Sequence, residues 1–298
     1  AVMGGGYNGS VNPNYGSAVF IVDLENGGKL LKKIDILDTS TSNIVNSIPA
    51  DLRVITANST DKADYNGAMV YAADLEGKIS KINLTDVGTL YETATFFDAQ
   101  SNTSNGRYLF NSPEATINSD GNLWLYFGTG NSQKLQEQSS SVKNRVYGIK
   151  DTNFPRSTAT ISKNTVQYCS KSSCPTAHIG WYVDLPNSRK VTAEPTIDKD
   201  RVYFPLYEPT YGANSCKTGK AILSAYDSLC GSSVLMTEVG TGVLSKVLVR
   251  KDRLYMGISG EVKKNVSGFT NKDNLLSTQS KAVSQGKQVQ IEFWRENY

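Results

Sequence analysis

Histidine is almost absent from this 298-residue sequence, which contains only His178. A metal centre built from several histidines is therefore excluded, and a Ser-His-Asp triad would have to use this one residue. Because His178 directly precedes residues 179–181, an Ile-Gly-Trp segment, we interpret it as a loop or strand-start residue rather than a catalytic base.

Long apolar runs are also missing. No segment approaches the roughly 20 apolar residues that cross a bilayer, and residues 1–6 lack the basic and apolar regions of a signal peptide. The 31 basic and 28 acidic residues leave a net charge of +3, which is too small an excess to indicate a nucleic-acid-binding surface. We expect a chain, mature or a fragment, that neither spans a membrane nor binds nucleic acid.

Cysteine is scarce, and its spacing is informative. Two local pairs lie in polar, glycine-containing surroundings, Cys169 with Cys174 and Cys216 with Cys230. This pattern predicts two small disulfide loops and an oxidising compartment. Four reduced thiols or a zinc site are the alternatives, and the lack of a CxxC spacing disfavours zinc.

Short apolar strands joined by Asp- and Gly-containing turns are what the sequence has in abundance. Residues 70–83 read as a strand, an Asp-Leu-Glu-Gly-Lys turn and a second strand, and residues 19–35 repeat this order with two residues added in the turn. Both segments predict β-hairpins, because β-branched and aromatic residues favour strands whereas Asp, Asn and Gly favour turns.

A second repeat extends the unit. Residues 199–204 are echoed by 251–256 and, more loosely, by 119–127, and each follows an extended segment. Aromatic-strand anchors recur near Met3, Tyr71, Tyr126, Tyr203 and Tyr255. Units of roughly 40 to 50 residues with four short strands predict an all-β fold, a β-propeller of four-stranded antiparallel blades. We expect residues 1–298 to form one domain of about four or five blades.

Both ends of the chain carry information on the blades. Residues 2–8 align with 126–131, the second strand of a blade, so we expect a first blade without its opening strand. The propeller would then be truncated at its N-terminal side and belong to a larger parent protein. Residues 289–293 alternate apolar and polar side chains, as expected of a terminal strand that completes a blade. Polar inserts at 131–144 and 168–177 are the places where variable residues on a rigid scaffold would carry function.

Few motifs indicate chemistry. Residues 4–9 satisfy GxGxxG, but no helix follows, so we interpret them as a glycine-rich strand end. Asp61 and Asp64 are the kind of carboxylate pair that a glycosidase uses, although nothing places a substrate beside them. Residues whose side chains offer hard oxygen ligands cluster just before residue 70. We interpret this segment either as a degenerate Ca²⁺ loop or as a solvated turn. Its candidate ligands are Asn58, Asp61, Asp64 and Asn66.

Tyrosine is frequent, and most of the 16 tyrosines are expected to pack as strand residues. Tyr207 and Tyr211 are candidates for exposed positions on an insert loop, where they would contact a partner.

Several segments in a shared order resemble the C-terminal β-propeller domain of the PilY1/PilC family of type IV pilus-associated proteins. They are residues 67–79, 123–130, 145–151, 180–186, 194–195, 202–204, Cys216, 230–231 and 293–296. The resemblance implies a Gram-negative surface or secreted protein that supports pilus assembly, opposes retraction and acts as a tip adhesin. It implies pilins at the pilus tip as partners, together with a host-surface ligand. The family's Asp-rich calcium loop is replaced here by residues 57–67, which puts calcium control of retraction in doubt.

Two other functions compete with a non-enzymatic, pilus-associated binding propeller. A quinoprotein-like dehydrogenase would need polar residues, often histidine or a vicinal disulfide, at the central channel, and one histidine without adjacent cysteines argues against it. An outer-membrane assembly scaffold would instead bind periplasmic partners.

Overall fold

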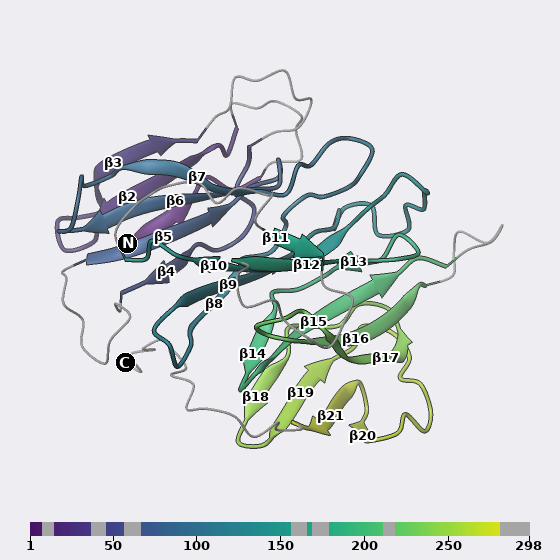
Figure 1. The fold of residues 1–298 in the computed structure, drawn as a ribbon. Coiled ribbons are helices and arrows are strands. Elements are labelled where there is room, and N and C mark those ends of the chain that lie inside the picture. Colours follow the sequence, from purple (N-terminus) through teal and green to yellow (C-terminus); the bar gives the residue numbers. More distant parts are fainter. Residues whose placement is uncertain are drawn as a thin grey trace.

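The computed structural model describes residues 1–7, 15–36, 46–56, 67–155, 166–168, 179–210 and 218–280. Every regular element in these ranges is a β-strand, and the strands form five sheets (Figure 1). The prediction of an all-β chain is confirmed.

The sheets follow one another in chain order. The first contains β1 (Val2–Gly4), β2 (Ala18–Asp23) and β3 (Lys29–Asp35), and the second contains β4 (Arg53–Ile55), β5 (Gly67–Ala73), β6 (Lys78–Thr85) and β7 (Thr93–Asp98). The third runs β8 (Glu114–Ile117), β9 (Leu123–Gly128), β10 (Arg145–Asp151), β12 (Gly180–Asp184), with β11 (Val166–Tyr168) parallel to β12 at its outer edge.

The last two sheets repeat the pattern. In the fourth, β13 (Lys190–Val191) and β14 (Thr196–Asp198) both pair with β15 (Arg201–Glu208), followed by β16 (Lys220–Asp227) and β17 (Ser233–Thr241). The fifth has the order β18 (Leu248–Arg250), β19 (Arg253–Gly257), β21 (Leu275–Gln279) and β20 (Phe269–Lys272). Apart from the parallel strand β11, the sheets are antiparallel, and they are the predicted propeller blades.

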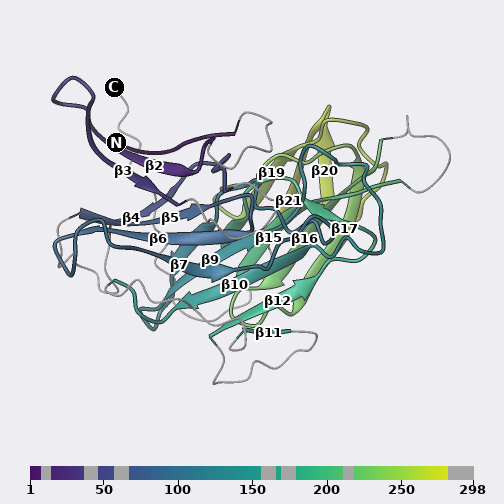
Figure 2. The same ribbon diagram turned by 90° about the horizontal axis from the view of Figure 1, so that it is seen from above.

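Neighbouring sheets pack face to face. One apolar cluster lies between each successive pair; for example, Tyr71 of β5 and Leu125 of β9 belong to the cluster shared by the second and third sheets. Burial of each such side chain stabilises the fold by about 1.5–3 kcal/mol. Both views place the first sheet at one end of the arrangement and the fifth at the other (Figures 1 and 2). Stacking of sheets, rather than one central core, therefore holds the described chain together.

The two predicted hairpins are confirmed, but they occupy different places in their sheets. Residues 70–83 form β5, a turn and β6, the second and third strands of the second sheet. In the first sheet, Gly5 N donates to Ala18 O (2.8 Å) as Thr129 N donates to Arg145 O (2.9 Å) in the third. Strands β1, β2 and β3 therefore match β9, β10 and β12, the second to fourth strands of the third sheet. Residues 19–35, which form β2 and β3, thus correspond to the hairpin of the third and fourth strands of a blade. The shared sequence reflects turn chemistry, not blade position.

The turn of the 70–83 hairpin requires its glycine. Gly77 has φ +75°, a region that L side chains rarely adopt, and its N–H donates to Asp74 O (3.1 Å). A Cβ on Gly77 would lie 2.7 Å from the carbonyl oxygen of Arg107. Glycine thus permits both the turn and the close approach of the connection that leads into the third sheet.

Trp181 fills the interface between the third and fourth sheets. Its side chain is fully buried, and its indole N–H donates to Ser228 O at 2.8 Å. A Cβ on Gly148 of β10 or on Gly231 of the turn after β16 would lie 2.4 Å from the indole ring. Both glycines are needed because the ring occupies the space that their side chains would take.

Candidate functional site

Most residues singled out from the sequence lie outside the described ranges. These are the candidate calcium ligands Asn58, Asp61, Asp64 and Asn66, the cysteines Cys169, Cys174 and Cys216, and also His178, Tyr211 and the terminal segment 289–293. Cys230 is described and is disulfide-bonded. The calcium loop and the pairing of the cysteines stay predictions.

The expectation for Tyr207 is wrong. Its side chain is buried, because β15 continues as an apolar strand through Glu208 instead of ending before the tyrosine. The Tyr207 hydroxyl accepts hydrogen bonds from Gln136 Nε2 and from Gly219 N, both at 2.7 Å. Tyr207 therefore anchors the loop after β9 and is not available to a partner.

The described ranges contain no cluster of three or more His, Cys, Asp or Glu side chains arranged to hold a metal ion. In the same ranges, no helix has the length and apolarity of a membrane crossing.

Four charged side chains meet where the innermost strands of the second to fifth sheets begin. They are Arg53 and Glu114, which begin β4 and β8, and Glu194 and Lys246, which lie two residues before β14 and β18. Arg53 Nη2 lies 3.4 Å from Glu114 Oε2 and 3.9 Å from Glu194 Oε2. Lys246 Nζ lies 3.4 Å and 2.7 Å from the same two oxygens. We call this closed arrangement the axial ring.

The axial ring is electrically balanced, since each carboxylate faces both cations. Arg53 also donates from Nε to Pro113 O at 2.6 Å, which fixes its guanidinium against the third sheet. The Arg53 side chain is 9% exposed, so its pairs are screened less than surface pairs. The ring consequently connects four sheets, and the charges of its four described members cancel.

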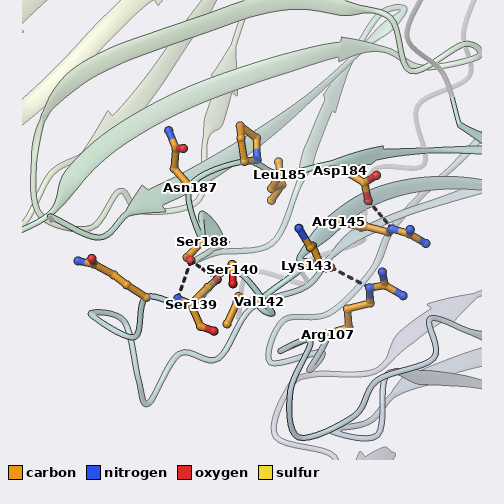
Figure 3. A pocket seen from close by; sticks show the side chains of 12 residues that line it. Arg107, Ser139, Ser140, Val142, Lys143, Arg145, Asp184, Leu185, Asn187 and Ser188 are labelled. Carbon is orange, nitrogen blue, oxygen red and sulfur yellow. Dashed lines mark hydrogen bonds and ion pairs between the residues drawn. The ribbon is translucent and has the colours of Figure 1, made fainter.

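A pocket of about 1050 Å³ opens on the loops at one end of the third sheet (Figure 3). Its walls come from three connections, which are Arg107 before β8, residues 138–143 before β10 and residues 185–188 after β12. Arg145 and Asp184, at the ends of β10 and β12, complete the lining. The insert 131–144, predicted from the sequence to carry function, thus supplies one wall.

Hydrogen bonds hold the two opposing loops together. Ser139 N donates to Ser188 Oγ (3.1 Å), and Ser188 Oγ donates to Ser139 O (3.0 Å). The buried Lys190 donates from Nζ to Glu137 O at 2.7 Å. Asn187 and Ser188 have φ of +55° and +54°, an unfavourable backbone for residues other than glycine that surrounding structure must maintain. The wall is therefore fixed before any ligand arrives.

Positive charge gathers at one side of the pocket. Arg145 Nε donates to Asp184 Oδ1 at 2.6 Å, and the guanidinium lies 4.1 Å from the centre of the Tyr182 ring. Arg107 donates to two carbonyl oxygens, of Lys143 (2.8 Å) and Ala99 (3.3 Å). Burial lowers the pKa of Arg107, because its charged form loses water. Lys143 is exposed.

A buried acidic cluster surrounds the turn between β5 and β6. Asp74 Oδ1 accepts a hydrogen bond from Lys78 N (2.9 Å), and its Oδ2 accepts one from Asn46 Nδ2 (3.2 Å). Asn46 also donates to Glu76 Oε2, which pairs with Lys78 Nζ at 3.1 Å. Burial, which outweighs these hydrogen bonds, raises the pKa of Asp74 to about 7.

The raised pKa of Asp74 predicts a pH-dependent stability. Between about pH 4 and pH 7 the folded protein holds a proton on Asp74 that the unfolded chain releases, so stability falls as pH rises through this range. We expect a loss of up to about 4 kcal/mol, since one pKa unit corresponds to about 1.4 kcal/mol. Denaturant unfolding at several pH values measures it.

The Asp74→Asn variant should remove most of this slope, because an amide does not ionise. Asp252→Asn, at an exposed turn position, is the matched control and should leave the slope unchanged. Equal slopes in wild type and Asp74→Asn would contradict the assignment.

Stacked sheets of three to five strands, with an axial ring and a loop-lined pocket, define a β-propeller-type fold. No family model matches the chain. A type IV pilus biogenesis factor, the PilY1 homolog of Xylella fastidiosa (strain Temecula1), is 26% identical over 271 residues, which cover 79% of this chain and 18% of that protein. The crystal structure of the Pseudomonas aeruginosa PilY1 C-terminal domain superimposes with a TM-score of 0.59 at 16% identity, over 88% of this chain and 68% of that one.

The resemblance to PilY1 is thus confirmed, in sequence by the first comparison and in fold by the second. A quinohemoprotein alcohol dehydrogenase from Comamonas testosteroni gives a TM-score of only 0.36 at 10% identity, over 95% of this chain and 45% of the enzyme, and supports no assignment. The chain spans less than a fifth of the length of the PilY1 homolog that it matches.

Proposed function

We propose that residues 1–298 form a single propeller-type domain of a longer, PilY1-like protein of type IV pilus biogenesis. The observation that carries this proposal is the 26% identity to the PilY1 homolog over 271 residues. The fold shared with the PilY1 C-terminal domain supports it.

In this proposal the domain is a binding module and not an enzyme. It supports pilus assembly, opposes retraction and contributes to surface adhesion, with minor or major pilins at the pilus tip and a host-surface molecule as partners. Loops at the strand ends, positioned by rigid sheets, are the natural place for such contacts, and the pocket beside the 131–144 insert is of this kind. The protein would be exported through the periplasm to the cell surface, at the pilus tip or outer membrane.

Location tests the proposal. An epitope-tagged full-length parent protein is expected in the surface fraction that is sheared from piliated cells, together with the pilins. Its amount there should fall in cells that lack the major pilin, while a periplasmic marker controls for lysis. A tagged protein that stays with the cells in both strains would contradict a pilus-associated location.

A further inference from the structure

The loop pocket carries more cationic charge than its neighbours neutralise. Its described lining contains Arg107, Lys143 and Arg145 but a single carboxylate, Asp184, which pairs with Arg145. Neither Arg107 nor Lys143 has a carboxylate within ion-pair distance among the described residues. The pocket therefore carries two positive charges in excess.

Arg107 is the informative member of this set. Its guanidinium is half-buried, and its pKa is lowered because the loss of water from its charged form outweighs the attraction of nearby groups such as Asp184. Its two hydrogen bonds go to neutral carbonyl oxygens, which hold the side chain in place but leave its charge uncompensated. Partial burial of a cation that has no ion-pair partner within the described residues is costly, and a bound anionic group would relieve that cost.

The pocket has two chemically different sides. Figure 3 shows the guanidinium groups of Arg107 and Arg145 pointing the same way on one side, with Ser139, Ser188 and Asn187 on the other. Leu185, also in the lining, adds apolar surface. Ser188 is buried and its hydroxyl is engaged with Ser139, so a ligand that spans the pocket would meet cations at one end and the exposed side chains of Ser139 and Asn187 at the other.

We propose that this pocket binds an extended acidic peptide segment, with a carboxylate at the arginine side and its backbone along the serine side. Its volume of about 1050 Å³ lies just above the roughly 300–1,000 Å³ of small-molecule sites and is large for a single ion. The lining residues that the structure describes include no aromatic ring on which a sugar could stack. The negative charge of Asp184 repels a doubly charged phosphate or sulfate more strongly than a carboxylate, which carries a single charge.

This inference rests on the proposed binding function for its biological meaning, but the test isolates the pocket. The probe is a short fluorescent peptide of alternating Ser and Glu with blocked ends, and its Gln counterpart is the neutral control. Fluorescence anisotropy with the purified chain should show that the Glu peptide binds at least about tenfold more tightly, with an affinity that falls as ionic strength rises.

Two variants locate the binding. Lys143→Gln changes an exposed side chain and should preserve the fold, so we expect it to weaken binding of the Glu peptide about tenfold. Arg107→Gln should weaken it further. Lys264→Gln, an exposed lysine on the fifth sheet's loop, removes the same charge elsewhere and should change the affinity little.

Three results would overturn the proposal. The first is equal affinity for the Glu and Gln peptides, and the second is an affinity of Lys143→Gln for the Glu peptide equal to that of the wild type. The third is displacement of the peptide by a heparin oligosaccharide that binds more tightly, which would assign the pocket to a sulfated sugar. A failure here leaves the pilus proposal standing, because location and piliation are measured independently of this peptide.

Discussion

Replacing Lys81 with methionine is expected to lower the free energy of unfolding by about 3–5 kcal/mol. Lys81 Nζ lies 2.6 Å from Asp151 Oδ2, and the two side chains are 0% and 1% exposed. The pair connects β6 of the second sheet to β10 of the third. Methionine has a similar volume, so the variant removes the charge while the space stays filled.

The large effect follows from what the substitution leaves behind. Asp151 would keep hydrogen bonds from the Tyr71 hydroxyl (2.6 Å) and from Asn153 N (3.0 Å), but its charge would be buried without a cation. Burial lowers the pKa of Lys81 in the intact pair, because the interface between the two sheets removes water from its charged form.

Urea unfolding compares three variants with the wild type. Lys81→Met combined with Asp151→Asn removes both charges and should recover a substantial part of the lost stability, because no ion is then left unpaired. Lys264→Met, at an exposed position, should stay within about 0.5 kcal/mol of the wild type. A stability of Lys81→Met equal to that of this control would show that the pair does not secure the interface between the two sheets.

Local chemistry made much of the fold predictable. The hairpin of residues 70–83 is encoded by Asp74 and Gly77, whose turn preferences do not depend on the rest of the chain. Recurrence of such turns with aromatic strands then indicated blades, because a single four-stranded unit cannot bury both of its faces.

What the sequence did not reveal depends on contacts between sheets. Lys81 is a charged residue in a strand, yet stacking of the third sheet on the second buries it completely. The axial ring joins residues that are far apart in the sequence, such as Arg53 and Glu194. These residues share a position at or just before the beginning of an inner strand. That position does not predict ion pairs until the packing of the sheets is known.

The pocket was predictable in part. The 131–144 insert stood out by its polar composition, and it lines the pocket as a functional loop would. Arg107 and the 185–188 wall come from other connections, and no motif links them. The prediction for Tyr207 was wrong because strand β15 extends through Glu208, so that Tyr207 lies in a strand and not on an insert loop.

Loss of surface pili is the second large effect that we predict. If the domain supports assembly or opposes retraction, an allele of the parent gene without the codons for residues 1–298 should lose surface pili and twitching to the level of a strain that lacks the whole gene. Immunoblotting of the shortened protein controls for its abundance. Deleting the retraction motor in this strain then separates the two roles, since pili return only if the domain opposes retraction.

Counting surface pili in that deletion strain tests the pilus-related function most directly. The proposed role predicts few pili with the shortened allele and wild-type numbers when the intact gene is restored. Wild-type piliation and twitching in cells that contain the shortened protein would contradict it.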